Sequence, residues 1–181
     1  MVYFISDFHF GHTKVIEYGE RPFTSLEEMN DKMAADYNSV VTPEDTVYIV
    51  GDLSLGGIER AKEYLSKLNG KKILIRGNHD RGSKEDLLNA GYEEVHDTLI
   101  LKHDGITIGL SHYPFRPPGE MPGKYDLKPD QCDFLIHGHL HQIQKEKIHE
   151  SGKLMVNVSV EVLNYLPISL DEVVKIYRST I

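Results

Sequence analysis

Short apolar segments alternate with amphipathic segments along the first half of the chain. Residues 2–6, 46–50 and 72–75 are short apolar runs, which are typical of buried strands. Residues 25–40 and 58–67 place apolar side chains three to four positions apart, and this spacing predicts helices with one buried face. Residues 83–90 predict a shorter helix that begins at a serine and is followed by glycine. This alternation of strands and helices predicts an α/β fold.

Strand-like segments dominate the second half. Residues 99–103 and 106–111 predict a β-hairpin, because the Asp104-Gly105 pair between them supplies the positive φ angles of a tight turn. Further strands are predicted at residues 134–137, 143–148 and 153–160, and a last helix at residues 170–177. Because so many strands do not fit one simple parallel sheet, the sequence predicts two packed sheets with helices outside them.

A proline-rich stretch, residues 113–129, separates the hairpin from the later strands. It holds five of the eight prolines in the chain, which predicts a long surface loop. Long loops in compact domains are often functional, so we expect this loop to form one wall of a site.

The composition limits the class of protein. A length of 181 residues with 40% hydrophobic residues suits a single domain over residues 1–181. No apolar run approaches the ~20 residues that span a bilayer, and the N-terminal stretch lacks the basic region of a signal peptide, so no membrane association is expected. The single cysteine, Cys132, excludes an internal disulfide and a Cys-based zinc site. We therefore expect a cytoplasmic protein.

The charge and the histidine content point to a local site. A formal net charge of −8 argues against binding to long nucleic acids, which requires many Lys or Arg contacts with phosphates. It allows a small anion site. Ten histidines are many for this length, and their positions carry most of the information.

Polar clusters rich in His, Asp and Asn follow several of the predicted strands. These clusters are Ser6-Asp7-Phe8-His9, Gly51-Asp52, Gly77-Asn78-His79-Asp80, Ser111-His112 and His137-Gly138-His139-Leu140-His141. Loops at strand ends are where α/β folds assemble their sites. Carboxylate, carboxamide and imidazole ligands without thiolates suit Mn, Fe, Zn or Ni. Each motif alone is common by chance, whereas five in order, each just beyond a strand, predict a metal site.

The order of these motifs resembles that of the calcineurin-like metallophosphoesterase superfamily. The resemblance runs from Asp7 to His141 and implies a four-layer sandwich of two mixed sheets flanked by helices, with two metal ions at the strand ends; we favour manganese. It implies that one ion is held by Asp7, His9, Asp52 and His141. It implies that the other is held by Asp52, Asn78, His112 and His139, so that Asp52 bridges the two. His79 would be the catalytic histidine and not a ligand.

Chemical reasoning agrees with this assignment. A bridging carboxylate holds two cations about 3.5–4 Å apart, and the two ions lower the pKa of a shared water and clamp the phosphoryl oxygens. We expect attack by the resulting bridging hydroxide, with His79 as the general acid that protonates the leaving group. Asp80 follows His79 directly, and we expect it to orient or charge the imidazole.

Three further residues are candidates for substrate binding. His12 follows His9 on the same loop. We expect it either to contact the substrate or to be a solvated loop histidine. Arg21 and Arg116 are candidate phosphate forks, with an ordinary surface arginine as the alternative for each. Arg116 is the better placed, since its loop leaves directly from His112, and we expect it to point toward the metals. His137 is expected to pack or to support a ligand, and Cys132 to be buried.

The leading hypothesis is a dinuclear metal-dependent phosphoesterase. Phosphodiesters of small or nucleotide-like substrates are favoured over phosphoproteins, because the chain leaves little room for a peptide-docking appendage. A phosphomonoesterase or protein phosphatase, or a nuclease of the same fold, is the alternative. A non-enzymatic scaffold of this fold, as in the related retromer subunit, would be expected to have lost motif residues, which are intact here. The two-histidine phosphoesterases are excluded, because their paired motifs are absent. The sequence does not distinguish a monomer from a homo-oligomer.

Overall fold

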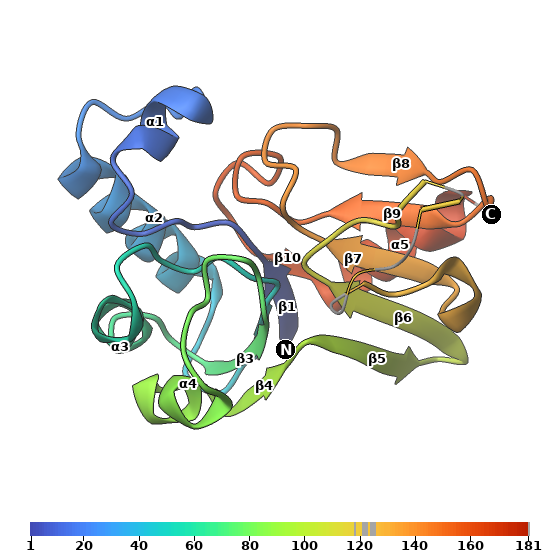
Figure 1. Ribbon diagram of the computed structural model, residues 1–181, viewed down its shortest axis with the longest axis horizontal. Coiled ribbons are helices and arrows are strands. Elements are labelled where there is room, and N and C mark those ends of the chain that lie inside the picture. The colour runs from blue at the N-terminus through green and yellow to red at the C-terminus, as the bar shows by residue number, and fades with distance from the viewer. Residues whose placement is uncertain (118, 121–122, 124–125, 181) are drawn as a thin grey trace.

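Two five-stranded mixed sheets pack face to face in the computed structural model (Figure 1). The structure describes residues 1–117, 119–120, 123 and 126–180. The first sheet has the order β10-β1-β2-β3-β4, with strands Ile168–Ser169, Val2–Ile5, Thr46–Ile49, Lys71–Ile75 and Glu94–His96. The second has the order β5-β6-β7-β9-β8, with strands Thr98–His103, Ile106–Ser111, Phe134–His137, Leu154–Asn157 and Glu146–Ile148. The predicted α/β fold of two sheets with helices is therefore confirmed.

Parallel strands lie at the centre of both sheets. β1, β2, β3 and β4 run parallel, and only β10 pairs antiparallel within the first sheet. In the second sheet β6, β7 and β9 run parallel, whereas β5 and β8 pair antiparallel at the edges. Because parallel strands end at the same edge of a sheet, the loops that follow them meet at one place.

The helices cover one face of the first sheet and one side of the sandwich. They are α1 (Lys14–Tyr18), α2 (Leu26–Val40), α3 (Ile58–Leu65), α4 (Lys84–Ala90) and α5 (Leu170–Thr180), with a short 3₁₀ turn at Pro129–Gln131. Buried side chains of α2, α3 and α4, such as Met33, Tyr64 and Leu87, pack in one core with Ile5, Ile49 and Leu74 of the first sheet. In Figure 1, α1 to α4 lie on one side of the first sheet, away from the second sheet. None of the helices in the described part of the chain is long and apolar enough to cross a membrane.

A second core fills the space between the sheets. Phe4 and Ile75 of the first sheet pack with Leu110 and Ile136 of the second. The last helix, α5, joins this core, and its Tyr177 ring stacks on Phe134 with 4.7 Å between the ring centroids. The helix thus covers one side of the sandwich and leaves the ends of the parallel strands uncovered.

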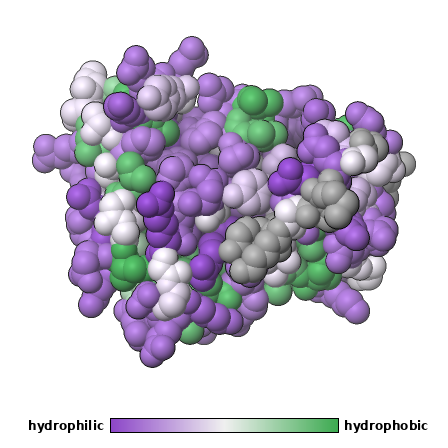
Figure 2. Space-filling view, in the orientation of Figure 1, coloured by the Kyte–Doolittle hydropathy of each residue, from purple (hydrophilic) through white to green (hydrophobic). Residues whose placement is uncertain are grey.

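The outer face of the second sheet is covered by loop. Phe115, Leu127 and Cys132 pack there against Leu135 and Met155. In the described residues this fourth layer therefore consists of loop, where the family resemblance implied flanking helices. The face of the molecule in Figure 2 is mostly hydrophilic, with small separate apolar areas.

The elements follow the sequence pattern closely, with three additions. The hairpin turn has φ of 48° at Asp104 and 76° at Gly105, as the sequence predicts. The strand expected at 143–148 is confined to Glu146–Ile148 and the one expected at 153–160 to Leu154–Asn157. α1, β4 and β10 have five, three and two residues, so they are too short to give a periodic pattern.

The two sheets are joined at the end of β1. The Ser6 amide donates to the Val158 carbonyl at 2.8 Å, and the Val160 amide donates to the Ser6 carbonyl at 3.1 Å. This bridge brings the loop after β1 beside the segment that follows β9. As a result, polar residues from both sheets reach one another across the top of the sandwich.

Candidate metal centre

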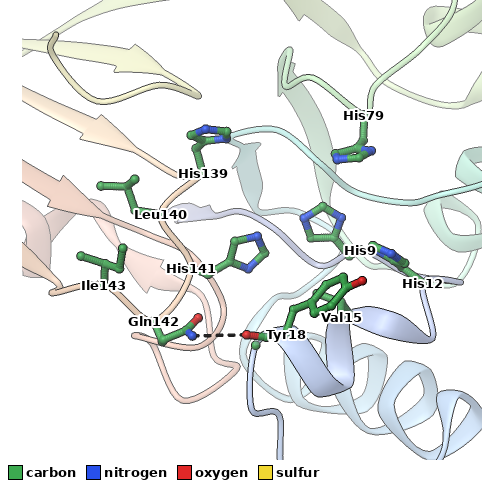
Figure 3. A pocket seen from close by; sticks show the side chains of 11 residues that line it. His9, His12, Val15, Tyr18, His79, His139, Leu140, His141, Gln142 and Ile143 are labelled. Carbon is green, nitrogen blue, oxygen red and sulfur yellow. Dashed lines mark hydrogen bonds between the residues drawn. The ribbon is translucent and has the colours of Figure 1, made fainter.

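The structure brings together the polar clusters that follow β1, β2, β3, β6 and β7. Three groups of three side chains could each hold a metal ion, because the ligand atoms within each group lie within 4.8 Å of one another. They are Asp7, His9 and His141; His9, Asp52 and His79; and Asp7, Asp52 and His112. The members come from five loops, so the cluster depends on the whole sheet topology. Figure 3 shows His9, His79, His139 and His141 around the opening of this site.

Asp52 lies at the centre of the cluster. Its Oδ2 atom is 3.6 Å from Nε2 of His9 and 3.5 Å from Nε2 of His112. Its Oδ1 atom accepts a hydrogen bond of 2.9 Å from the His79 amide, which fixes the carboxylate. The side chain is buried, so one oxygen atom faces imidazoles of two different loops without exposure to bulk water.

Asp7, His9 and His141 form one half of the cluster. Asp7 Oδ1 lies 3.7 Å from Nε2 of His9 and 3.9 Å from Nε2 of His141, and the rings of His9 and His141 stack with centroids 5.1 Å apart. Asp7 Oδ1 and both ring nitrogens of His9 are buried without a hydrogen-bond partner. Buried polar atoms that lack a partner cost free energy, and a cation between these atoms accounts for their arrangement.

The environment of Asp7 favours its ionised form. Burial acts to raise the pKa of this carboxyl, but the interaction with His9 and the nearby imidazoles of His112 and His141 outweigh it and hold the pKa below its usual range. An ionised carboxylate is the form that binds a metal.

His112, Asn78 and His139 form the other half. Nδ1 of His112 is 2.9 Å from the Val50 carbonyl, so Nδ1 carries the proton and donates a hydrogen bond to that carbonyl. Nε2 is then free to face Asn78 Oδ1 at 3.2 Å and Asp52. Asn78 and His139 are both exposed, and the His139 ring lies 5.1 Å from that of His112. His139 and His141 thus lie in different halves of the cluster.

The backbone at the predicted ligands is strained. Five of the ten described non-glycine residues with positive φ are predicted ligands: Asp7 (59°), His9 (52°), Asp52 (57°), His139 (70°) and His141 (46°). L-residues adopt this left-handed region at a cost, and such strain persists where the surrounding structure enforces it and gathers at functional sites.

Two glycines are required by close approach. A Cβ atom at Gly77 would overlap Oδ1 of Asp52, and one at Gly138 would overlap Oδ2 of Asp7 and Oγ of Ser6. The structure shows that space for the carboxylates is the reason, since neither glycine has a positive φ.

A buried ion pair behind His141 was not predicted from the sequence. Oε1 of Glu161 lies 2.8 Å from Nδ1 of His141, and Nε and Nη2 of Arg21 donate to the same oxygen at 3.0 and 2.7 Å. Burial raises the pKa of Glu161, but His141 and Arg21 outweigh this effect and lower it. A carboxylate behind a ligating histidine fixes the ring and its tautomer.

Arg21 is therefore not a phosphate fork, and that interpretation is corrected. Its guanidinium is buried and also donates to the backbone carbonyls of Asp7 at 2.6 Å and of Phe8 at 2.7 Å. The alternative of an ordinary surface arginine is also wrong. With its donors occupied inside the protein, Arg21 holds the loop after β1 against Glu161.

Further support of the site comes from Ser6 and His139 of the predicted motifs and from Asn157 and Ser159, which the motifs did not single out. Oδ2 of Asp7 accepts hydrogen bonds from Oγ of Ser6 at 2.6 Å, from Oγ of Ser159 at 2.9 Å and from the His139 amide at 2.9 Å. Asn157 donates to the carbonyls of His141 and Ile143 and so fixes the loop after β7. The position of Asn157 and Ser159 at a strand end is a signal that could have found them, whereas Glu161 lies in no recognisable motif.

We expected Asp80 to orient or charge the His79 ring, but its carboxylate is bound elsewhere. Its carboxylate accepts hydrogen bonds from the amides of Asp52 and Gly77, both at 2.8 Å, and from the Leu53 amide at 3.3 Å. A buried carboxylate needs donors, and these backbone amides provide them. Asp80 thus joins the loops after β2 and β3 and positions Asp52.

Arg116 is also corrected. It pairs with Asp126 through Nε and lies 3.6 Å from Glu120 through Nη1, so acidic residues of its own loop hold it away from the cluster. Beyond Tyr113, whose ring lies 4.9 Å from that of His139, Phe115 and Leu127 turn onto the outer face of the second sheet. The predicted loop wall is therefore limited to its first residues among those described; residues 118, 121, 122, 124 and 125 of this loop lie outside the described residues.

Two further histidines, His12 and His137, and the single cysteine occupy distinct places. His12 lies beside the cluster, with its ring 5.6 Å from that of His9 and 6.4 Å from that of His79. His137 is buried, with Nδ1 at 2.8 Å from the Gly138 carbonyl, as expected of a packing or supporting residue. Cys132 is buried, as expected.

An open pocket of about 500 Å³ leads from the surface to the cluster. It is lined by His9, His12, Val15, Tyr18, Gly19, His79, His139, Leu140, His141, Gln142 and Ile143. None of these described lining residues is Lys, Arg, Asp or Glu. The pocket therefore has an imidazole-rich inner end and an apolar outer part (Figure 3).

A mixed two-sheet sandwich with carboxylates and imidazoles gathered at its strand ends has the features of a metallohydrolase. Residues 1–159 match the family model of the calcineurin-like phosphoesterase superfamily domain. The chain belongs to this superfamily, whose members are metal-dependent phosphoesterases, as the sequence motifs predicted.

Similar proteins span nearly the whole chain. An uncharacterized protein of Methanocaldococcus jannaschii is 36% identical over 179 residues, which cover 97% of this chain and 90% of the relative. The Gene 66 protein of Mycobacterium phage L5 is 29% identical over 196 residues, which cover 94% of this chain and 91% of that protein. A solved structure of a protein of unknown function from Aquifex aeolicus is 33% identical, with a TM-score of 0.74 over 97% of this chain and 98% of that one.

Proposed function

We propose that this protein is a dinuclear metal-dependent phosphodiesterase that hydrolyses small or nucleotide-like phosphate esters. The observation that carries the proposal is the position of Asp52, whose Oδ2 atom faces His9 on one side and His112 on the other at 3.6 and 3.5 Å. One carboxylate oxygen between two sets of ligand atoms is the arrangement that a pair of cations requires.

The residues fit two divalent cations. Asp7, His9, Asp52 and His141 would hold one, and Asp52, Asn78, His112 and His139 would hold the other. The partnerless Asp7 Oδ1 and His9 Nε2 supply donor atoms that nothing else in the described chain uses. Bound divalent cations would activate a water molecule and draw charge from the phosphoryl group. We favour manganese, which accepts this mixture of oxygen and imidazole ligands.

His79 is the general acid in this proposal. Its imidazole lines the pocket with 31% of the side chain exposed, and Nε2 lies 4.0 Å from Asp52 Oδ2. The hydrogen bond from its amide to Asp52 fixes the backbone, so the ring stays beside a phosphoryl group bound at the cluster. From there the imidazole donates a proton to the departing alkoxide. His12, on the other side of the same opening, would contact the substrate.

The pocket favours small esters. Its described lining carries no Lys or Arg side chain that would follow the phosphates of a nucleic acid strand. The net charge of −8 also disfavours binding of a long nucleic acid strand. A cytoplasmic location is part of this proposal, supported by the free, buried thiol of Cys132.

Turnover of matched substrates tests the proposal. The protein is stripped of metal with a chelator, reloaded with Mn²⁺ and assayed with bis(p-nitrophenyl) phosphate, p-nitrophenyl phosphate, 2′,3′-cyclic AMP and a phosphothreonine peptide. We expect metal-dependent hydrolysis, with the diesters turned over faster than the monoester and the peptide. Asp52→Asn should remove the activity, and the surface variant Asp36→Asn should retain it. Activity without metal, or hydrolysis of monoesters alone, would contradict the proposal.

A further inference from the structure

Two of the most exposed large apolar side chains line the pocket of the candidate centre. Tyr18 is 65% exposed and Ile143 is 59% exposed, and both line the pocket that contains His9, His79 and His141. A single exposed apolar residue needs no explanation, but two in one pocket beside a candidate catalytic cluster mark a binding surface.

The two side chains come from different elements and face the same space. Tyr18 ends α1, which follows the loop of His9, and Val15 of the same helix lies beside it (Figure 3). Ile143 and Leu140 belong to the loop after β7 that carries His139 and His141. In Figure 3, Tyr18 lies on one side of His141, and Leu140 and Ile143 lie on the other.

Gln142 closes the end of this space away from His79. Its Nε2 donates to the Tyr18 carbonyl at 3.4 Å, which links the loop after β7 to the end of α1. The pocket is thus a slot with an imidazole-rich inner end and an aromatic wall opposite an aliphatic wall. The φ of 46° at His141 and the hydrogen bonds from Asn157 to the His141 and Ile143 carbonyls hold the aliphatic wall in place.

The chemistry of the slot selects its occupant. The described lining has no Lys or Arg, and its histidines gather at the inner end, so a second phosphate or a carboxylate would find no permanent cation in the outer part. An exposed tyrosine ring offers a flat face, and flat faces bind planar rings by stacking. A volume of about 500 Å³ lies within the range of pockets for small ligands.

We propose that this slot binds the nucleobase of a nucleotide substrate, stacked on Tyr18 and packed against Leu140 and Ile143, while its phosphate lies at the histidine cluster. The inference rests on the proposed phosphoesterase function and names its substrate class. Tyr18, Leu140 and Ile143 are then residues that determine specificity, and they act through contact with the part of the substrate that does not react.

A pair of ligands that differ only in the base tests this assignment. AMP and ribose 5-phosphate are titrated by calorimetry into the Mn²⁺-loaded His79→Asn protein, in which turnover during the titration is suppressed. We expect AMP to bind at least about tenfold more tightly, because stacking of a base on an aromatic side chain has about this effect. Tyr18→Ala should raise the Kd of AMP about tenfold and leave that of ribose 5-phosphate within twofold, whereas Tyr18→Phe should keep the preference.

Two controls test whether the preference for AMP arises in the slot and from a planar ring. Ile148→Ala removes a side chain that is 50% exposed and lies outside the slot, so it should leave the preference unchanged. Octyl phosphate carries an alkyl chain in place of the ring; it can pack on the aliphatic wall but cannot stack on Tyr18, so it should bind more weakly than AMP.

Any one of four results would overturn the assignment. The first three are equal affinity for AMP and ribose 5-phosphate, equal loss of both in Tyr18→Ala, and octyl phosphate binding as tightly as AMP. The fourth is lack of AMP binding. Diester hydrolysis by the Mn²⁺-loaded unaltered protein would then show that the phosphoesterase function stands without the base slot, and lack of hydrolysis by that protein would show that both fail.

Discussion

Oε1 of Glu161 lies 2.8 Å from Nδ1 of His141, so a carboxylate behind the ring orients the opposite nitrogen, Nε2, toward Asp7. This contact joins the segment after β9 to the loop after β7. It places a charged group behind a candidate ligand, and it depends on the fold rather than on any motif.

Glu161→Gln should weaken metal binding. Glutamine retains the shape but loses the charge that raises the basicity of the ring, and changes of this kind cost about 10–100-fold in metal affinity. Titration of the metal-free protein with Mn²⁺, followed by calorimetry, measures the effect. Glu150→Gln, at an exposed position, is the matched control and should bind as the unaltered protein does. Unchanged affinity in Glu161→Gln would show that the carboxylate does not support His141.

Arg21→Ala should destabilise the protein strongly. The variant leaves the buried Glu161 carboxylate without its cation and the carbonyls of Asp7 and Phe8 without a donor. Breaking a buried pair from one side costs about 3–5 kcal/mol. Urea unfolding of the metal-free protein measures this loss. The exposed pair of Lys32 and Asp36 provides the control, since Lys32→Ala should change the unfolding midpoint little. A small effect of Arg21→Ala would mean that the guanidinium is not anchored as described.

His79→Asn should lower turnover and leave metal binding near normal. Loss of a general acid reduces the rate by roughly 10²–10⁴-fold, and the loss is least for substrates with good leaving groups. Comparison of p-nitrophenyl and alkyl diesters tests this dependence, and metal analysis is done on the same samples. Because Nε2 of His79 also lies 4.0 Å from Asp52, loss of metal in this variant would identify His79 as a ligand instead.

The thiol of Cys132 should make the protein less stable at alkaline pH. Burial raises the pKa of this thiol from 9.0 to about 11. The unfolded chain therefore releases the proton first, and folding stability is full below pH 9 and falls as pH rises from 9 to about 11, by on the order of 2 kcal/mol. Urea unfolding at pH 8, 9 and 10.5 should show a steeper decline for the unaltered protein than for Cys132→Ala. Equal slopes would show that the thiol does not titrate differently in the folded state.

Much of the fold could be predicted because its signals are local. The Asp104-Gly105 turn and the serine at the start of α4, Ser83, each depend on a few neighbouring residues, and both form as expected. The short elements α1, β4 and β10 could not be predicted, since their few residues carry no periodicity and depend on the strands beside them.

The candidate site likewise has a part that could be predicted from the sequence and a part that could not. Its motifs are short and follow strands, so their convergence could be expected from topology. The arginines could not be assigned, because their roles depend on distant or irregular partners. Arg21 pairs with Glu161, which lies 140 residues away, and Arg116 pairs with Asp126, neither of which belongs to a helix or strand. A motif predicts which side chains meet at a strand end, but it does not predict what lies behind them.

Anomalous X-ray diffraction from crystals of the Mn²⁺-loaded protein tests the central claim most directly. We expect two peaks on either side of Asp52, with His141 bound to the ion beside Asp7 and His9, and with His139 bound to the ion beside Asn78 and His112. A single well-occupied ion with His139 and His141 both bound to it would contradict the account.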